Sequence, residues 1–118
     1  MAKKILSISY DEPLLTTREM LLAQAGYEVT SALGFDEAMK HCEGPAYDLV
    51  ILGHSIPRRD TQDLLRQVRR SAKVPVVSLR RYGEDPTPGA DYSVENSEGP
   101  QVLLGAVKKA LGARRKND

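Results

Sequence analysis

Continuous apolar runs mark the centre of the predicted fold. Residues 49–52 carry no polar side chain, and residues 74–79 are largely apolar. Such runs are typical of strands buried on both faces of a parallel sheet. Shorter or alternating stretches complete the predicted set, which covers residues 5–9, 27–32, 48–52, 74–79 and 91–94.

Apolar residues between these strands recur at helical spacing. The predicted stripes are residues 14, 21 and 25 with 15 and 22 beside them, then 35, 38, 39 and 42, then 64, 65 and 68, and finally 103, 104, 107, 110 and 111. We expect the first helix to open at residues 11–13 and the last at Pro100, because proline suits the first helical turn.

Glycines and a capping carboxylate predict where these helices end and begin. We expect Gly26 to end the first helix, Gly44 and Pro45 to break the second, Gly112 to end the last, and Asp60 to cap the third. This leaves one domain over residues 1–112, followed by a basic polar tail over residues 113–118.

Strands that alternate with helices predict an α/β fold, in which a doubly wound parallel sheet carries helices on both faces. The segment between Leu79 and Asp91 contains two prolines and two glycines, so we expect a loop with at most one helical turn. Ligands of such sheets bind beyond the carboxyl ends of the strands. Residues 53–57, after the central strand, are therefore where chemistry is expected.

Composition narrows the function classes. The 118 residues carry a net charge of +1 and a single cysteine, and contain no run long enough to span a bilayer or to form a signal peptide. We therefore expect a soluble cytoplasmic protein with no membrane partner. The absence of Trp and the single Phe argue against extensive stacking on nucleic-acid bases.

Charge is unevenly distributed along the chain. Residues 54–81 hold eight basic side chains against two acidic ones, whereas residues 82–100 hold five acidic side chains and no Lys or Arg. The basic segment could dock on an acidic protein or a nucleic-acid backbone. An ordinary solvated helix face is the favoured interpretation, and nucleic acid is an unlikely partner because no recognition motif is present.

Several stretches in this order resemble response-regulator receiver domains, the phosphate-accepting modules of two-component signalling. They are residues 5–8 leading to 11–13, residues 25–29, residues 48–52 followed by Ile56 and Pro57, residues 64–69 followed by 74–77, and residues 89–92. The resemblance runs from about residue 4 to residue 111. It implies a flavodoxin-like five-stranded sheet of order 2-1-3-4-5. The family's fourth helix should lie between Leu79 and Asp91, where the segment is too short and too rich in proline, so we expect that helix to be shortened or absent.

The same resemblance indicates that the phosphorylation site is degenerate. The acceptor aspartate of the family corresponds to Gly53, and its pair of magnesium-binding acids corresponds to Ser9 and Tyr10. Asp11 and Glu12 lie close by and could supply at most half of a metal site. Magnesium prefers carboxylate oxygens, so we expect weak or absent Mg²⁺ binding and assign no metal ligand.

Two further family positions are replaced. The switching Ser or Thr corresponds to Arg80, and the family's lysine falls on or near Glu95. Arg80 and Arg81 could bind an anion such as a nucleotide. We favour instead that Arg80 fills the vacated pocket and pairs with Asp11, Glu12 or Glu95, because charges near a sheet end are usually paired.

Other reactive side chains have ordinary interpretations. His54 follows the acceptor position, but no nucleophile or orienting carboxylate accompanies it by spacing. Cys42 lies on an apolar stripe, and no second cysteine could resolve an oxidised form. We assign no catalytic residue and do not expect an enzyme.

The sequence thus predicts a pseudo-receiver that is not phosphorylated at the usual position and acts through protein–protein contacts. Two alternatives stay open, an anion- or nucleotide-binding module using Arg80 and Arg81, and a phosphorelay receiver with a non-standard acceptor such as Asp11 or Asp60. The expected partner is an unidentified protein, with a homodimer as one form.

Overall fold

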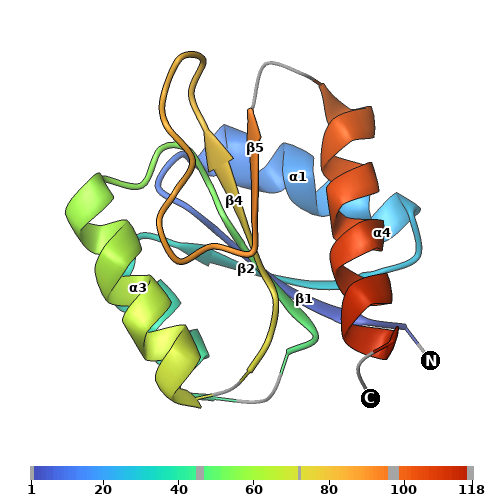
Figure 1. Ribbon diagram of the computed structural model, residues 1–118, viewed down its shortest axis with the longest axis horizontal. Helices are drawn as coiled ribbons and strands as arrows, with labels where there is room; N and C mark the ends of the chain where they lie inside the picture. The colour runs from blue at the N-terminus through green and yellow to red at the C-terminus, as the bar shows by residue number, and fades with distance from the viewer. Residues whose placement is uncertain (1, 45–46, 72, 96–98, 117–118) are drawn as a thin grey trace.

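A parallel sheet with helices on both faces forms the protein (Figure 1). The computed structural model describes residues 2–44, 47–71, 73–95 and 99–116. The elements in chain order are β1 (Lys4–Ser9), α1 (Glu12–Gln24), β2 (Glu28–Leu33), α2 (Phe35–Cys42), β3 (Leu49–Leu52), α3 (Arg58–Ser71), β4 (Val76–Arg80), β5 (Tyr92–Glu95) and α4 (Pro100–Lys116). None of the helices in these described residues is long and apolar enough to cross a membrane.

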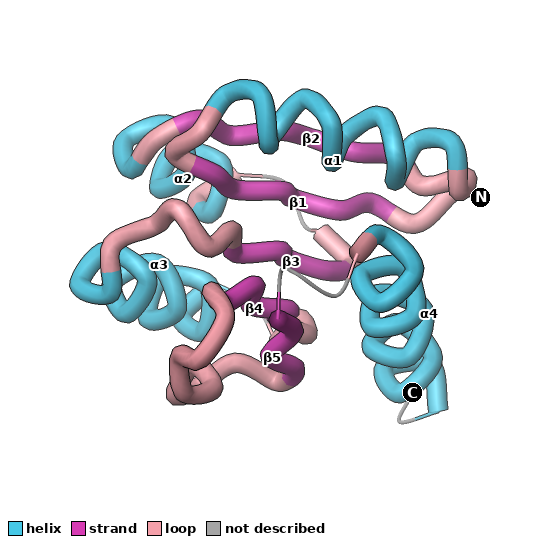
Figure 2. Tube along the Cα trace, turned by 90° about the horizontal axis from the view of Figure 1, so that it is seen from above, coloured by secondary structure: helices cyan, strands magenta, loops and turns pink. Residues whose placement is uncertain are grey.

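The five strands are all parallel, in the order β2-β1-β3-β4-β5 (Figure 2). The predicted fold class and strand order are confirmed. The central strand β3 is buried along its whole length, as its continuous apolar run predicted. The carboxyl ends of β1, β3 and β4 therefore meet at one edge of the sheet, which is where a site is expected.

Two apolar cores lie on opposite faces of the sheet. Alternate residues of β1 and β3 point to each side, so Leu6 and Val50 join one core whereas Ile5 and Ile51 join the other. The first core is closed by α2 and α3, and the second includes residues of α1 and α4. Figure 2 shows α3 and α4 on opposite sides of the strands.

The first helix opens and ends where predicted, and its buried face includes an arginine. Asp11 caps α1, since its Oδ1 accepts a hydrogen bond from the Leu14 backbone N–H at 3.1 Å, and Gly26 has a φ of +96° just after the helix. The residues that α1 buries are Leu15, Arg18 and Leu22. Of the expected stripe, residues 15 and 22 are buried, residues 14 and 21 are half-buried and residue 25 is exposed. The unexpected member of the buried face is Arg18.

Two predicted helix boundaries were wrong. Helix α3 begins at Arg58, so Asp60 lies within its first turn and does not cap it. Helix α4 continues past Gly112 to Lys116, so the expected tail from residue 113 is helical over its first four residues. Residues 117 and 118, like Pro45 at the predicted break after α2, lie outside the described part of the chain.

The connection between β4 and β5 contains no helix. Residues 81–90 form turns and irregular backbone, as their prolines and glycines predicted. The expectation that the family's fourth helix is shortened or absent is therefore confirmed. On this face of the sheet, α3 packs beside α2 on one side and lies next to this loop on the other (Figure 1).

Candidate functional site: the carboxyl edge of the sheet

Gly53 follows β3 directly and lies in a closely packed position. Its backbone N–H donates a hydrogen bond to the Ile8 carbonyl oxygen at 2.9 Å. A Cβ atom at position 53 would lie 2.9 Å from that same oxygen and 3.1 Å from Nη1 of Arg18. The position therefore has neither an acceptor carboxylate nor unoccupied space for one in this backbone arrangement.

Ser9 and Tyr10 join the loop after β1 to the loop after β3. The hydroxyls of Ser9 and Ser55 lie 3.1 Å apart, and the Tyr10 backbone N–H donates to Ser55 Oγ at 2.9 Å. The Tyr10 hydroxyl donates to Asp60 Oδ2 at 2.7 Å. Burial, followed by this hydrogen bond, raises the pKa of Tyr10 above its usual range, so the phenol stays protonated.

The residues present do not fit a magnesium ion. At the family's acid-pair positions there are only neutral hydroxyl groups, and the Tyr10 hydroxyl is already donated to Asp60. Asp11 uses Oδ1 to cap α1, and Glu12 is exposed in the first turn of that helix. Within the described residues, no group of three or more His, Cys, Asp or Glu side chains could hold a metal.

Arg18 supplies the cation nearest to the acceptor position. This side chain from α1 is 6% exposed, and its Nη1 has no hydrogen-bond partner within the described structure. Burial lowers the pKa of Arg18, and the charge of Asp11 acts in the opposite direction. The guanidinium beside Gly53 therefore belongs to Arg18 and not to Arg80, which corrects the expectation from the sequence.

Arg80 instead pairs within the sheet edge. It lies opposite Glu95 in the parallel register of β4 and β5, and the two side chains form an ion pair at 3.5 Å. Its Nη1 also donates to the Glu84 carbonyl oxygen at 2.9 Å. The predicted pairing is confirmed for Glu95.

A pocket of about 500 Å³ lies beside this edge, between the start of α3, the ends of β3 and β4, and the 81–90 loop. Its lining includes His54, Arg58 and Arg81 but not Arg80. Of the two arginines predicted to bind an anion, only Arg81 therefore lines the pocket. Sequence reasoning missed Arg58 as a lining residue, because it lies just after residues 53–57, where chemistry was expected.

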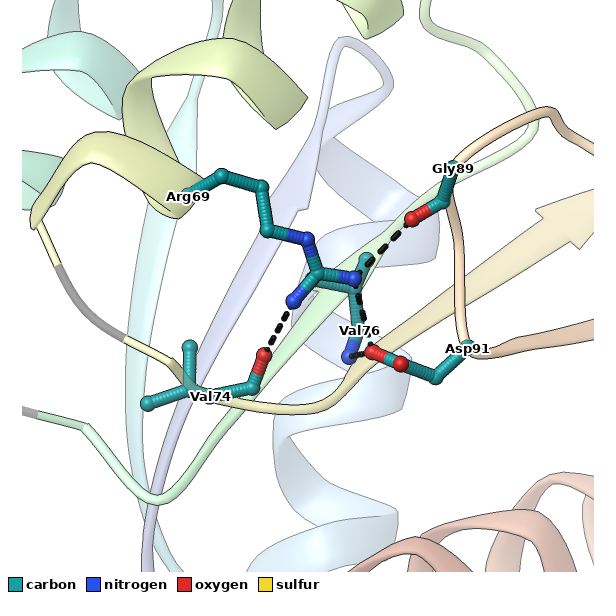
Figure 3. Close-up of polar contacts among 5 residues, drawn as sticks. All are labelled: Arg69, Val74, Val76, Gly89 and Asp91. Atoms are coloured by element: carbon teal, nitrogen blue, oxygen red, sulfur yellow. Dashed lines mark hydrogen bonds and ion pairs between the residues drawn. The ribbon is translucent and has the colours of Figure 1, made fainter.

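The loop that closes the pocket is fixed by hydrogen bonds. The hydroxyls of Ser78 and Thr87 lie 2.7 Å apart, and the Thr87 backbone N–H donates to Ser93 Oγ at 3.3 Å. At its base, the Arg69 guanidinium of α3 reaches into the turn before β5 (Figure 3). The loop is thus positioned against β4, β5 and α3 without a helix of its own.

Arg69 organises that base through three acceptors. It donates to the carbonyl oxygens of Val74 and Gly89 at 2.7 and 2.9 Å and to Asp91 Oδ2 at 2.8 Å. The same carboxylate oxygen accepts from the Val76 backbone N–H at 2.7 Å (Figure 3). One guanidinium therefore ties α3 to the start of β4 and the approach to β5.

Comparison with known proteins places this architecture in a family. No family model matches the chain. The receiver domain protein (CheY-like) of Methanospirillum hungatei JF-1 superposes with a TM-score of 0.88 and 22% identity over the full length of both chains. The N-terminal domain of a response regulator from Carboxydothermus hydrogenoformans gives a TM-score of 0.84 and 26% identity, with 98% of each chain covered.

A curated relative agrees with these structures. The alkaline phosphatase synthesis transcriptional regulatory protein PhoP of Bacillus subtilis (strain 168) is 30% identical over 86 residues. The chain is a response-regulator receiver (CheY-like) domain. The match covers 72% of this receiver domain but only 36% of that relative, so the chain spans about a third of its length.

The family assignment defines the class of function. A receiver domain is a signal-transduction module of two-component systems and is not itself an enzyme. TrrA of Thermotoga maritima, a structural neighbour with a TM-score of 0.81 and 26% identity over 92% of this chain and 98% of that one, was solved with Mg²⁺ and BeF.

Proposed function

We propose that this receiver domain transmits its signal without phosphorylation at position 53, through contacts with other proteins. The observation that carries the proposal is the packing of Gly53. The position offers no carboxylate to form an acyl phosphate, and a side chain there would collide with the β1 backbone.

The surrounding charges support the same conclusion. A buried guanidinium from Arg18 stands beside the acceptor position, where the family's chemistry needs a divalent cation and two carboxylates. The Arg80–Glu95 ion pair leaves no hydroxyl at the switching position. A fixed cation and a fixed salt bridge favour one conformation, because neither depends on a reversible modification.

The surface for partner contacts is expected to differ from the family's usual one. In receiver domains the face built from the fourth helix, the fifth strand and the last helix often makes output contacts. Here that face lacks the helix between β4 and β5. We therefore propose protein partners, a second copy included, that do not require this helix, and sedimentation or light scattering of the purified chain tests for the homodimer.

Mass spectrometry after treatment with a phosphodonor tests the central proposal. The chain is incubated with acetyl phosphate and Mg²⁺ beside a receiver domain that keeps its acceptor aspartate. We expect a phosphoryl adduct on the control domain and none on this chain.

Two other aspartates, Asp11 and Asp60, are the alternative sites of phosphorylation that the mass-spectrometry experiment can detect. Asp11 and Asp60 are both half-buried, and both accept hydrogen bonds, from the Leu14 backbone N–H and from the Tyr10 hydroxyl. A phosphoryl group mapped to either residue would establish a phosphorelay receiver with a non-standard acceptor. That result would overturn the proposal that the domain signals without phosphorylation.

A further inference from the structure

The pocket beside α3 has the size of a small-molecule site. Its volume is about 500 Å³, and ligand pockets commonly measure roughly 300–1,000 Å³. It lies beyond the carboxyl ends of β3 and β4, where ligands of open α/β sheets bind. The irregular 81–90 loop forms its second wall.

Two guanidinium groups line this pocket and are free to bind a ligand. Arg58 begins α3 and Arg81 follows β4, and both side chains are exposed. In the part of the chain that the structure describes, neither side chain forms an ion pair or a hydrogen bond. Paired guanidiniums are well suited to oxyanions, since each can donate two parallel hydrogen bonds.

His54 adds an unsatisfied group to the inner wall. Both ring nitrogens are shielded from solvent, and neither has a hydrogen-bond partner among the described residues. Burial, then the charges of Arg18 and Arg81, lower the pKa of His54, so the ring is neutral and carries one N–H donor. Buried polar groups without partners are few in proteins, and a bound ligand or water normally accounts for them.

Several other polar side chains of the pocket already have partners. The hydroxyls of Ser55 and Ser78 are within hydrogen-bond distance of Ser9 and Thr87. Two acidic residues of the loop, 84 and 85, are exposed in the outer wall. Among the described lining residues, carboxylates are therefore confined to the loop, and the two guanidiniums and the His54 N–H are donors without partners.

We propose that this pocket reversibly binds a small molecule carrying a single phosphate group, with Arg58 and Arg81 as the charged contacts and His54 as a neutral donor. The start of α3 also favours a negatively charged ligand, because the partial positive end of the helix faces the pocket and Pro57 before it has no side-chain acceptor. The acidic outer wall disfavours a longer polyphosphate chain.

This inference goes beyond the proposed function. It adds a non-covalent input at a site beside the silent acceptor position, and it requires neither Mg²⁺ nor a phosphoryl transfer. The two proposals can fail separately, because a phosphoryl adduct is detected by mass whereas reversible binding leaves the mass unchanged.

Isothermal titration calorimetry in a Mg²⁺-free buffer tests the site with inorganic phosphate, AMP and ATP as probes. We expect saturable binding of AMP to the parent chain and weaker binding of ATP. The double variant Arg58→Ala/Arg81→Ala should weaken AMP binding by at least about tenfold, because it removes both charged contacts.

A charge-matched control separates this site from diffuse attraction. Arg59 and Arg70 are exposed on α3 and do not line the pocket, so Arg59→Ala/Arg70→Ala removes the same charge. This control should change AMP affinity by less than about twofold, because surface charges at a distance are screened by salt. An equal loss in both double variants would overturn the proposal.

The parent chain alone supplies a second readout. Amide chemical shifts in the AMP titration should change first at residues 53–58, 81 and 84–88, which line the pocket. Absence of saturable binding for all three probes up to about 10 mM, a free energy near −3 kcal/mol, would refute the site. Saturable shifts confined to other elements would refute it equally.

Discussion

A methyl group added at Gly53 probes the packing of the position that directly follows β3. The backbone there does not have a positive φ, so alanine brings no conformational strain. By restricting the unfolded chain it would stabilise the protein by about 0.4–1 kcal/mol. Its Cβ, however, would lie 2.9 Å from the Ile8 carbonyl oxygen and 3.1 Å from Arg18 Nη1.

The closer of these two contacts decides whether alanine raises or lowers the free energy of unfolding. The Ile8 oxygen belongs to the β1 backbone and accepts the hydrogen bond from the Gly53 N–H, so it cannot retreat without lengthening that bond. Overpacking a closed site costs about 1–3 kcal/mol. We therefore expect Gly53→Ala to lower the free energy of unfolding by roughly 0.5–2 kcal/mol once the entropic gain is subtracted.

Urea denaturation followed by circular dichroism measures this change, with Gly105→Ala as the matched control. Gly105 lies inside α4, and nothing lies within 4 Å of an added Cβ. Alanine there should raise the free energy of unfolding by about 0.5–1 kcal/mol. If Gly53→Ala is as stable as the parent while the control behaves as expected, position 53 has room and the packing explanation is wrong.

An aspartate at the same position reports on Arg18. Gly53→Asp places a carboxylate near the unpaired Nη1, and Arg18→Met removes the charge while keeping much of the volume. In a double-mutant cycle that combines these two substitutions, we expect a coupling free energy of at least about 1 kcal/mol in favour of the carboxylate–guanidinium pair, since contacting residues couple strongly. A coupling of zero would show that Arg18 does not face position 53.

Three further predictions concern pH, the loop base and the thiol. Because folding lowers the pKa of His54, the unfolded chain binds more protons below about pH 6.5, and stability should fall as the pH is lowered. The variant His54→Gln should flatten that part of the plot of urea midpoint against pH. Parallel plots for the parent and the variant would contradict this prediction. Arg69→Ala should cost about 1–3 kcal/mol of unfolding free energy, whereas Arg66→Ala, which removes only an exposed pair with a neighbour on α3, should cost less than about 0.5 kcal/mol. Burial raises the pKa of the Cys42 thiol to about 11, so a thiol reagent should label it slowly in the native protein and rapidly in urea, and rapid native labelling would disprove its burial.

Much of the fold followed from local patterns. The buried run of β3 and the alternation of strands with helices depend on residues close in sequence, and the resemblance supplied the strand order. The place of Gly53 directly after the central strand could likewise be predicted from the apolar run before it. The Arg80–Glu95 pair was predictable because both residues end neighbouring parallel strands.

Arg18 was missed because an arginine normally lies on the exposed side of a helix. The signal was present, since Arg18 stands between Leu15 and Leu22 at the spacing of a buried stripe. Gly112 was expected to end the last helix, but α4 continues through it. A helix can pass through a glycine at a cost of about 1 kcal/mol when the packing of neighbouring residues compensates, as that of Ala110 and Leu111 does here.

The helix-free crossover has a consequence for how the native protein opens. β5 is an edge strand of four residues, and on the α3 side the loop before it is held by the polar contacts of Arg69 and Asp91. A few hydrogen bonds separate more readily than a packed helix, so this corner should form the least stable cooperative unit of the sheet. In native-state hydrogen exchange, the amides of β5 should then exchange through a partial opening that leaves β1 and β3 protected, and the domain would carry a built-in site of local unfolding at one corner.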